Sequence, residues 1–264
     1  MLRILITPTL LLCFIADIRS QDHRATDINT NFWLSHWGDH RLHDRWSIHT
    51  EGHWRRTDLG ERWQQLLLRP AVNFHLNEQV LFTQGYSYYV NYPYSTHPIR
   101  FQNWEHHLWQ QVQLTQTIGR VRVQHRFRSE ERFIARLIPG SPDPSTAVFD
   151  GYGYQNRIRY RVWVTIPLGG AQVTAGRSTV NFYDEVFLGF GDPSRLDHIN
   201  QNRISALLGY QISEPFNLLA GYLYQTSQRP GAAAGRDLLE LNSTVHVVLI
   251  YNLDLRRKDR DRTS

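Results

Sequence analysis

The sequence is nearly free of cysteine and lysine. Cys13 is the only cysteine among the 264 residues, and Lys258 is the only lysine. Because Cys13 lies in an N-terminal apolar segment, the rest of the chain can form no disulfide, thiolate metal site or thiol nucleophile. The positive charge is almost entirely arginine, which forms planar, bidentate pairs with carboxylates and therefore suits a packed ion-pair network.

Long apolar runs are also missing. Residues 4–16 form a short apolar segment after Arg3, whereas a membrane-spanning helix needs about 20 apolar residues. We therefore interpret residues 1–20 as a secretory signal peptide. Leu12 precedes Cys13, where a lipidation signal would require a small residue. A mean hydropathy of −0.47 with abundant aromatic residues is typical of an outer-membrane β-barrel, in which only alternate strand residues face lipid.

Residues 121–134 show the pattern that organises the chain. Val121, Val123, His125, Phe127 and Phe133 alternate with a polar set. That set comprises Arg122, Gln124, Arg126, Arg128, Glu130 and Arg132. A strand places two such sets on opposite faces, whereas a helix would scatter them. The segment 152–166 repeats the pattern, so we expect two neighbouring strands, each with an arginine ladder on one face.

The same alternation predicts further strands along the chain. In order they are 28–37, 44–55, 63–76, 80–92, 104–118, 121–134, 152–166, 172–188, 199–212, 217–228 and 239–255. Strands of globular proteins average about five or six residues, and tilted membrane strands need about nine to eleven. The predicted strands are longer than the globular average, which favours a membrane barrel.

Connection lengths indicate the topology. Short connections are expected at 77–79, 119–120, 168–171 and 213–216, and longer ones at 93–103, 135–150, 189–198 and 229–238. Outer-membrane barrels alternate short periplasmic turns with longer external loops, and bacterial single-chain barrels use even strand numbers. Eleven candidates conflict with that rule, so ten or twelve strands are expected.

We therefore predict an all-β fold, a single antiparallel up-and-down transmembrane β-barrel of 10–12 strands. The signal peptide would occupy 1–20, the barrel 21–255 and a charged C-terminal tail 256–264. The alternative is a soluble, lipocalin-like barrel, which would turn the apolar face inward and the arginines outward. Solubility without detergent distinguishes the two.

Several segments, taken in order, resemble one protein family. They are Glu51…Arg55, Leu67-Leu68-Arg69-Pro70, Gln84-Gly85-Tyr86, the run 126–133, the run 157–161, Tyr183-Asp184-Glu185-Val186-Phe187, Asn202-Arg203 and Gly221-Tyr222. The array is similar to the DUF2490 family of uncharacterised Gram-negative proteins. The resemblance implies an outer-membrane barrel and brings no activity, cofactor or catalytic residue.

The strongest candidate site is a set of charges predicted to share the interior face. It comprises Glu51, Arg69, Arg126, Arg128, Glu130, Arg132, Arg157, Arg159, Arg161, Glu185 and Arg203. Asp184 is an alternative to Glu185, since a bulge would exchange their faces. Burying an unpaired ion costs several kcal/mol, so arginine–carboxylate pairs would fill and brace a narrow barrel. The excess of arginines also allows a small channel that favours anions.

An outer-membrane enzyme acting on lipid is a further alternative. His125 and Ser129 share a strand face, but four strand residues separate their Cα atoms by about 13 Å. A nucleophile and its base require about 3 Å, so these two residues cannot form such a pair. We predict no catalytic residues.

The sequence predicts no cofactor, no metal site and no nucleic-acid partner, although the formal net charge is +5. The arginines alternate with apolar residues inside strands and do not gather in a surface patch, which argues against nucleic acid. The thirteen histidines form no metal-binding motif. The expected partners are outer-membrane lipid and, during biogenesis, the barrel-assembly machinery.

Overall fold

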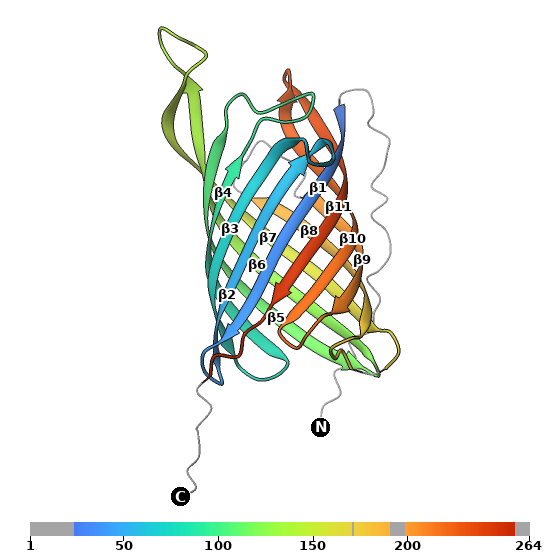
Figure 1. Ribbon diagram of the computed structural model, residues 1–264. Coiled ribbons are helices and arrows are strands. Elements are labelled where there is room, and N and C mark those ends of the chain that lie inside the picture. Colours follow the sequence, from blue (N-terminus) through green and yellow to red (C-terminus); the bar gives the residue numbers. More distant parts are fainter. Residues whose placement is uncertain (1–23, 171, 191–198, 257–264) are drawn as a thin grey trace, which may run out of the picture.

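A computed structural model describes residues 24–170, 172–190 and 199–256. The predicted signal peptide and all but the first residue of the predicted tail lie outside these described residues, as do Cys13 and Lys258. Eleven strands form one closed barrel (Figure 1). This confirms the predicted all-β barrel. Among the residues described, no helix is long and apolar enough to cross a membrane.

The strands follow one another around the barrel in chain order. They are β1 (Arg24–Arg41), β2 (Trp46–Thr57), β3 (Arg62–His75), β4 (Val80–Asn91), β5 (Asn103–Ile118), β6 (Val121–Pro139), β7 (Ala147–Pro167), β8 (Ser178–Phe190), β9 (Ile199–Gln211), β10 (Phe216–Ala233) and β11 (Arg236–Tyr251). A 3-10 turn, η2 (Asp58–Gly60), follows β2. Neighbours in chain order pair antiparallel.

The expected even strand number is wrong, because β1 pairs with β11 in parallel. Residues 24–37 of β1 align with residues 237–250 of β11. An odd number of strands gives the first and last strands the same direction, so a barrel of this kind closes only through one parallel pair. Closure leaves no unpaired sheet edge.

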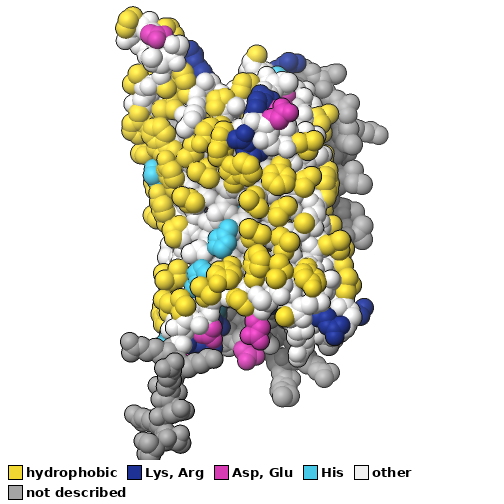
Figure 2. Space-filling model, viewed as in Figure 1, with side chains coloured by type: hydrophobic (Ala, Val, Ile, Leu, Met, Phe, Trp, Pro, Cys, Tyr) yellow, Lys and Arg dark blue, Asp and Glu magenta, His cyan; other side chains and the backbone are white. Residues whose placement is uncertain are grey.

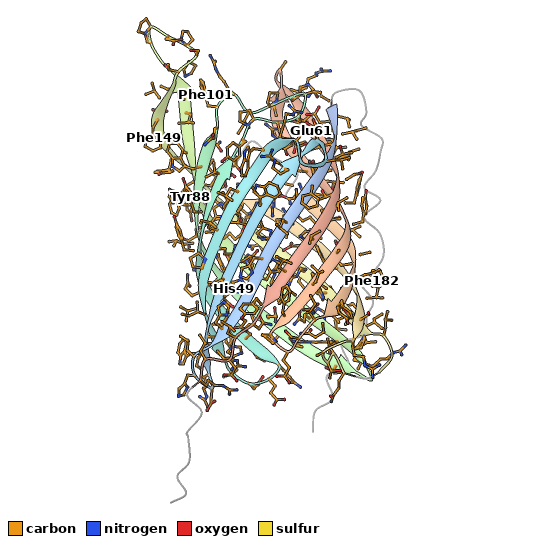
Figure 3. The ribbon with its side chains drawn as sticks, viewed as in Figure 1. His49, Glu61, Tyr88, Phe101, Phe149 and Phe182 are labelled. Atoms are coloured by element: carbon orange, nitrogen blue, oxygen red, sulfur yellow. The ribbon has the colours of Figure 1, made fainter. Side chains whose placement is uncertain are left out.

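We call the two ends of the barrel the turn end and the loop end. The turn end carries the connections after β1, β3, β5, β7 and β9, and the loop end carries those after β2, β4, β6, β8 and β10. The C-terminal end of β11 lies at the turn end (Figure 1). The predicted long loops at 135–150 and 229–238 are instead mostly strand. The β6–β7 hairpin projects beyond the barrel and carries Phe149 (Figure 3). The connection after β7 is longer than the predicted turn at 168–171, since β8 begins only at Ser178; residue 171 itself lies outside the described residues.

The outer wall is apolar. Large side chains such as Phe82, Phe127, Phe182 and Leu208 are exposed there. Tyr88 and Phe182 mark two opposite sides of the barrel (Figure 3). Figure 2 shows hydrophobic side chains across the middle of the barrel and charged ones gathered at its two ends. The soluble, lipocalin-like facing is therefore wrong, because the arginines of β6 and β7, apart from the exposed Arg136, point inward and line an interior cavity.

Close packing between β9 and β10 depends on Gly221. A Cβ atom at this position would lie 2.2 Å from the Ala206 carbonyl oxygen and 2.9 Å from the Leu207 Cα. We expect Gly221→Ala to lower the free energy of unfolding by about 1–3 kcal/mol, because backbone atoms cannot move aside cheaply. Gly52→Ala is the matched control, since its nearest neighbours would be 3.9 Å away. Equal urea midpoints for the two variants would contradict this account.

Candidate functional site

A cavity of about 860 Å³ lies inside the barrel. At the turn end it is lined by Thr174 and Glu214, which are exposed, so the cavity reaches that end of the barrel. Toward the loop end its lining finishes at the level of Arg55, Gln65 and Glu105. The cavity therefore extends from the middle of the barrel to the turn end.

The predicted charged residues gather in this interior. Ten of the eleven line the cavity, and the eleventh, Glu130, is fully buried against two of the others. Strand alternation puts them there, because β6 and β7 each direct every second residue inward. The choice between Asp184 and Glu185 is resolved in favour of Glu185. Asp184 faces outward, where its carboxylate accepts a hydrogen bond from the Asn202 side chain at 2.6 Å.

Two buried glutamates are the centres of the network. The Glu185 carboxylate accepts hydrogen bonds from Arg126 at 2.5 Å and from Arg159 at 2.8 Å, with Arg203 3.9 Å away. Glu130 accepts hydrogen bonds from Arg157 and Arg159, each at 2.7 Å. Arg159 therefore bridges both glutamates. Charge-assisted hydrogen bonds of this kind offset much of the cost of burying each ion.

Two smaller clusters continue the network. Glu51 accepts hydrogen bonds from Arg69 at 2.5 Å and contacts the His53 ring at 2.5 Å. Toward the loop end, Glu105 lies 2.6 Å from Arg132 and 2.8 Å from His107. Sequence reasoning missed Glu105, His53 and His107. Strand alternation in the sequence is enough to place these side chains on an inward face. Only the fold shows that they join a network with arginines of other strands.

Arginines outnumber carboxylates in the interior. Those lining the cavity are Arg55, Arg69, Arg122, Arg126, Arg128, Arg132, Arg157, Arg159, Arg161 and Arg203. Their acidic counterparts are Asp39, Glu51, Glu105, Glu185 and Glu214 on the lining, with Glu130 behind it. Some of the remaining guanidinium groups contact neutral side chains. Arg128 donates to Gln111 and lies 4.1 Å from the Trp109 ring, and Arg55 lies 4.0 Å from the Trp33 ring.

One side of the interior is apolar, which the sequence reasoning did not anticipate. A buried cluster spans β1 and β7 to β11 and comprises Trp33, Trp163, Tyr183, Leu207, Leu219, Leu223 and Val248. Trp37 packs against it, with its ring centroid 5.7 Å from that of Trp163. The interior is therefore not lined by charged and polar residues alone. Trp33 and Trp37 share the inward face of β1, and alternation alone does not say which face is inward.

The loop after β4, residues 92–102, crosses the loop end. The Thr96 hydroxyl donates to the Asp27 carboxylate, which also accepts the His97 backbone N–H at 3.2 Å. Tyr94 donates to Glu240 at 3.3 Å, and Arg229 donates to the same carboxylate at 2.7 Å. Arg229 also donates to the His97 carbonyl oxygen at 3.1 Å, so the loop contacts β1, β10 and β11, which lie three to five strands from β4 around the barrel. We call this arrangement the cap.

The other candidate residues lie on the outer wall. His125 faces outward and its Nδ1 atom lies 2.9 Å from the Tyr160 hydroxyl, while Ser129 is an exposed residue further along the same strand. Within the described ranges, no group of three or more histidine, cysteine or acidic residues is placed to hold a metal ion. The arrangement suited to a ligand is therefore the arginine-rich cavity.

Comparison with known proteins places the chain in a family. Neither curated proteins nor solved structures gave a match. A family model described as a protein of unknown function, DUF2490, matches residues 30–236, which is more than half of the chain and includes every residue of the predicted charged set. The chain belongs to the DUF2490 family.

Proposed function

We propose that the protein is a barrel of the Gram-negative outer membrane whose interior is a narrow, anion-selective path. The observation that carries this proposal is the excess of arginines around a cavity that reaches the turn end. The charged network has a second role, because its ion pairs brace the wall from within. No catalytic step is part of the proposal.

The outer wall supports the location. Its middle is apolar and its charges lie at the two ends (Figure 2), as expected for a wall that contacts lipid between two aqueous phases. A closed barrel also satisfies its backbone polar groups, which hydrocarbon requires. Outer-membrane lipid would then be the main partner, and the barrel-assembly machinery would insert the chain.

The interior charge supports selectivity for anions. Rings of basic side chains favour anions in pores, because a fixed charge in a narrow space raises the local concentration of the opposite ion. The turn end, which would face the periplasm, gives direct access to the cavity. At the loop end the cap spans the barrel, so conduction would depend on movement of residues 92–102.

Single-channel recording tests this proposal. Purified protein in a planar bilayer with a potassium chloride gradient is expected to give a reversal potential that shows chloride preference. Asp27→Asn should raise the open probability at least several-fold, because it weakens the acceptor of Thr96 and His97. Asp58→Asn, at the same end but bonded to Arg62, is the control. Cation preference would refute the proposed selectivity for anions. Silence of both the wild type and Asp27→Asn would refute the path itself and leave a structural barrel.

A further inference from the structure

Arg126 and Arg161 form an unusual pair in the cavity. They lie directly opposite each other on β6 and β7, where like charges normally destabilise a sheet. Glu185 is opposite Arg161 on the other side. Its carboxylate, however, accepts hydrogen bonds from Arg126 and Arg159. Arg161 therefore lies beside a carboxylate that is already bonded to other arginines.

Several donors at this level have no acceptor. Within the described part of the chain, the Nε atoms of Arg126 and Arg161 are buried without a hydrogen-bond partner, and so is Nη1 of Arg128, two residues nearer the loop end on β6. Arg126 is 8% exposed and Arg128 2% exposed, and both line the cavity. Among the described residues, Arg161 has ring contacts alone, with its guanidinium carbon 5.1 Å from the Trp163 ring. Buried donors without acceptors are costly, and an anion in the cavity would supply an acceptor to the guanidinium group of Arg161, which lines the cavity and bonds no other described residue.

We propose that Arg126 and Arg161 bind the oxyanion group, carboxylate or phosphate, of a small organic anion that enters from the turn end. Guanidinium edges match the planar geometry of such groups and bind them through two hydrogen bonds. This site rests on the proposed function, since it needs anions to enter the cavity. It goes beyond that function because it assigns a saturable site and a ligand class.

The surroundings fit the rest of such a ligand. Gln113 is opposite Arg126, and Gln124 is opposite Trp163 one level nearer the turn end. Both amides line the cavity, together with Trp37 and Trp163. Amides can bond hydroxyl or carbonyl groups, and the indole rings can contact an apolar or ring-shaped body. A cavity of about 860 Å³ has room for an anion much larger than an inorganic ion.

Tryptophan fluorescence measures binding directly, because Trp37 and Trp163 lie beside the proposed site. The detergent-solubilised full chain is titrated with inorganic phosphate and, separately, with cyclohexanecarboxylate at constant low sodium chloride. A saturable change is expected for at least one anion, and the tighter one identifies the oxyanion. Arg161→Gln should weaken binding at least tenfold. Arg161→Lys keeps the charge without the planar edge and should weaken it several-fold.

Arg55→Gln is the matched control. It removes the same charge from the cavity lining, but Arg55 lies on β2 and bonds Gln65. The affinity of this variant for the anion should therefore stay within twofold of the wild-type affinity. Equal weakening by Arg55→Gln and Arg161→Gln, or an unsaturable wild-type response, would overturn the site. If anion selectivity persists in bilayers without saturable binding, the site alone fails. If selectivity is also absent, the proposed function fails with it.

Discussion

Replacing Glu185 by glutamine is expected to lower the free energy of unfolding by about 3–5 kcal/mol, the usual cost of breaking a buried ion pair by removing one partner. The carboxylate accepts hydrogen bonds from Arg126 and Arg159 and lies near Arg203. With the neutral amide, Arg159 would keep its bond to Glu130, whereas Arg126 and Arg203 would lose the carboxylate that they contact among the described residues. Urea unfolding in phospholipid vesicles measures the difference.

Asp58→Asn provides the comparison. Its ion pair with Arg62 lies at the loop end, where both side chains are well exposed to solvent, and exposed pairs contribute about 0–1 kcal/mol. Comparable losses for Glu185→Gln and Asp58→Asn would mean that the interior network does not hold the wall together.

The second large effect concerns the outer wall. Val112 lies on β5 between Phe82 of β4 and Phe127 of β6, and both rings are exposed on the outer wall. In the proposed membrane, Val112→Arg should destabilise the barrel by about 2–4 kcal/mol, because a cation would enter the middle of the lipid-facing band. Folding titrations into phospholipid vesicles measure this cost.

Gln124→Arg is the control for this prediction. Gln124 faces the cavity, so a cation there would enter a polar space that reaches the turn end, and the loss should be a small fraction of that at Val112. A similar loss for the two variants would contradict the assignment of the apolar wall to lipid.

Much of the fold could be predicted because successive side chains of a strand point to opposite faces of the sheet. The alternation of Val123, Phe127 and Phe133 with Arg126 and Arg128 is local, and it sufficed to predict the β6 and β7 strands and their inward arginines. The identity of Glu185 as the interior carboxylate required the actual register of β8, since a one-residue shift would have brought Asp184 inward instead.

Other features depend on contacts between distant segments. The parallel pairing of β1 with β11 joins residues more than 200 positions apart, and no local pattern specifies it. The cap likewise brings Thr96 to Asp27 across the barrel. The inward face of Trp33 is decided by the neighbouring strands, because an indole suits either lipid or a buried interior. The unpaired donors of Arg161 become visible only once Glu185 is seen to bond other arginines.

The parallel seam between β1 and β11 has a topological consequence. In a barrel with an even number of strands, the first strand begins and the last strand ends at the same end of the barrel. This barrel has eleven strands, so β1 begins and β11 ends at opposite ends. In the proposed membrane, the attachment points at Arg24 and Arg256 would therefore face different aqueous compartments. Assembly would have to carry the amino end of β1 through the bilayer while the carboxyl end of β11 stays behind, so a bulky folded fusion partner should be tolerated after Arg256 and should block insertion before Arg24.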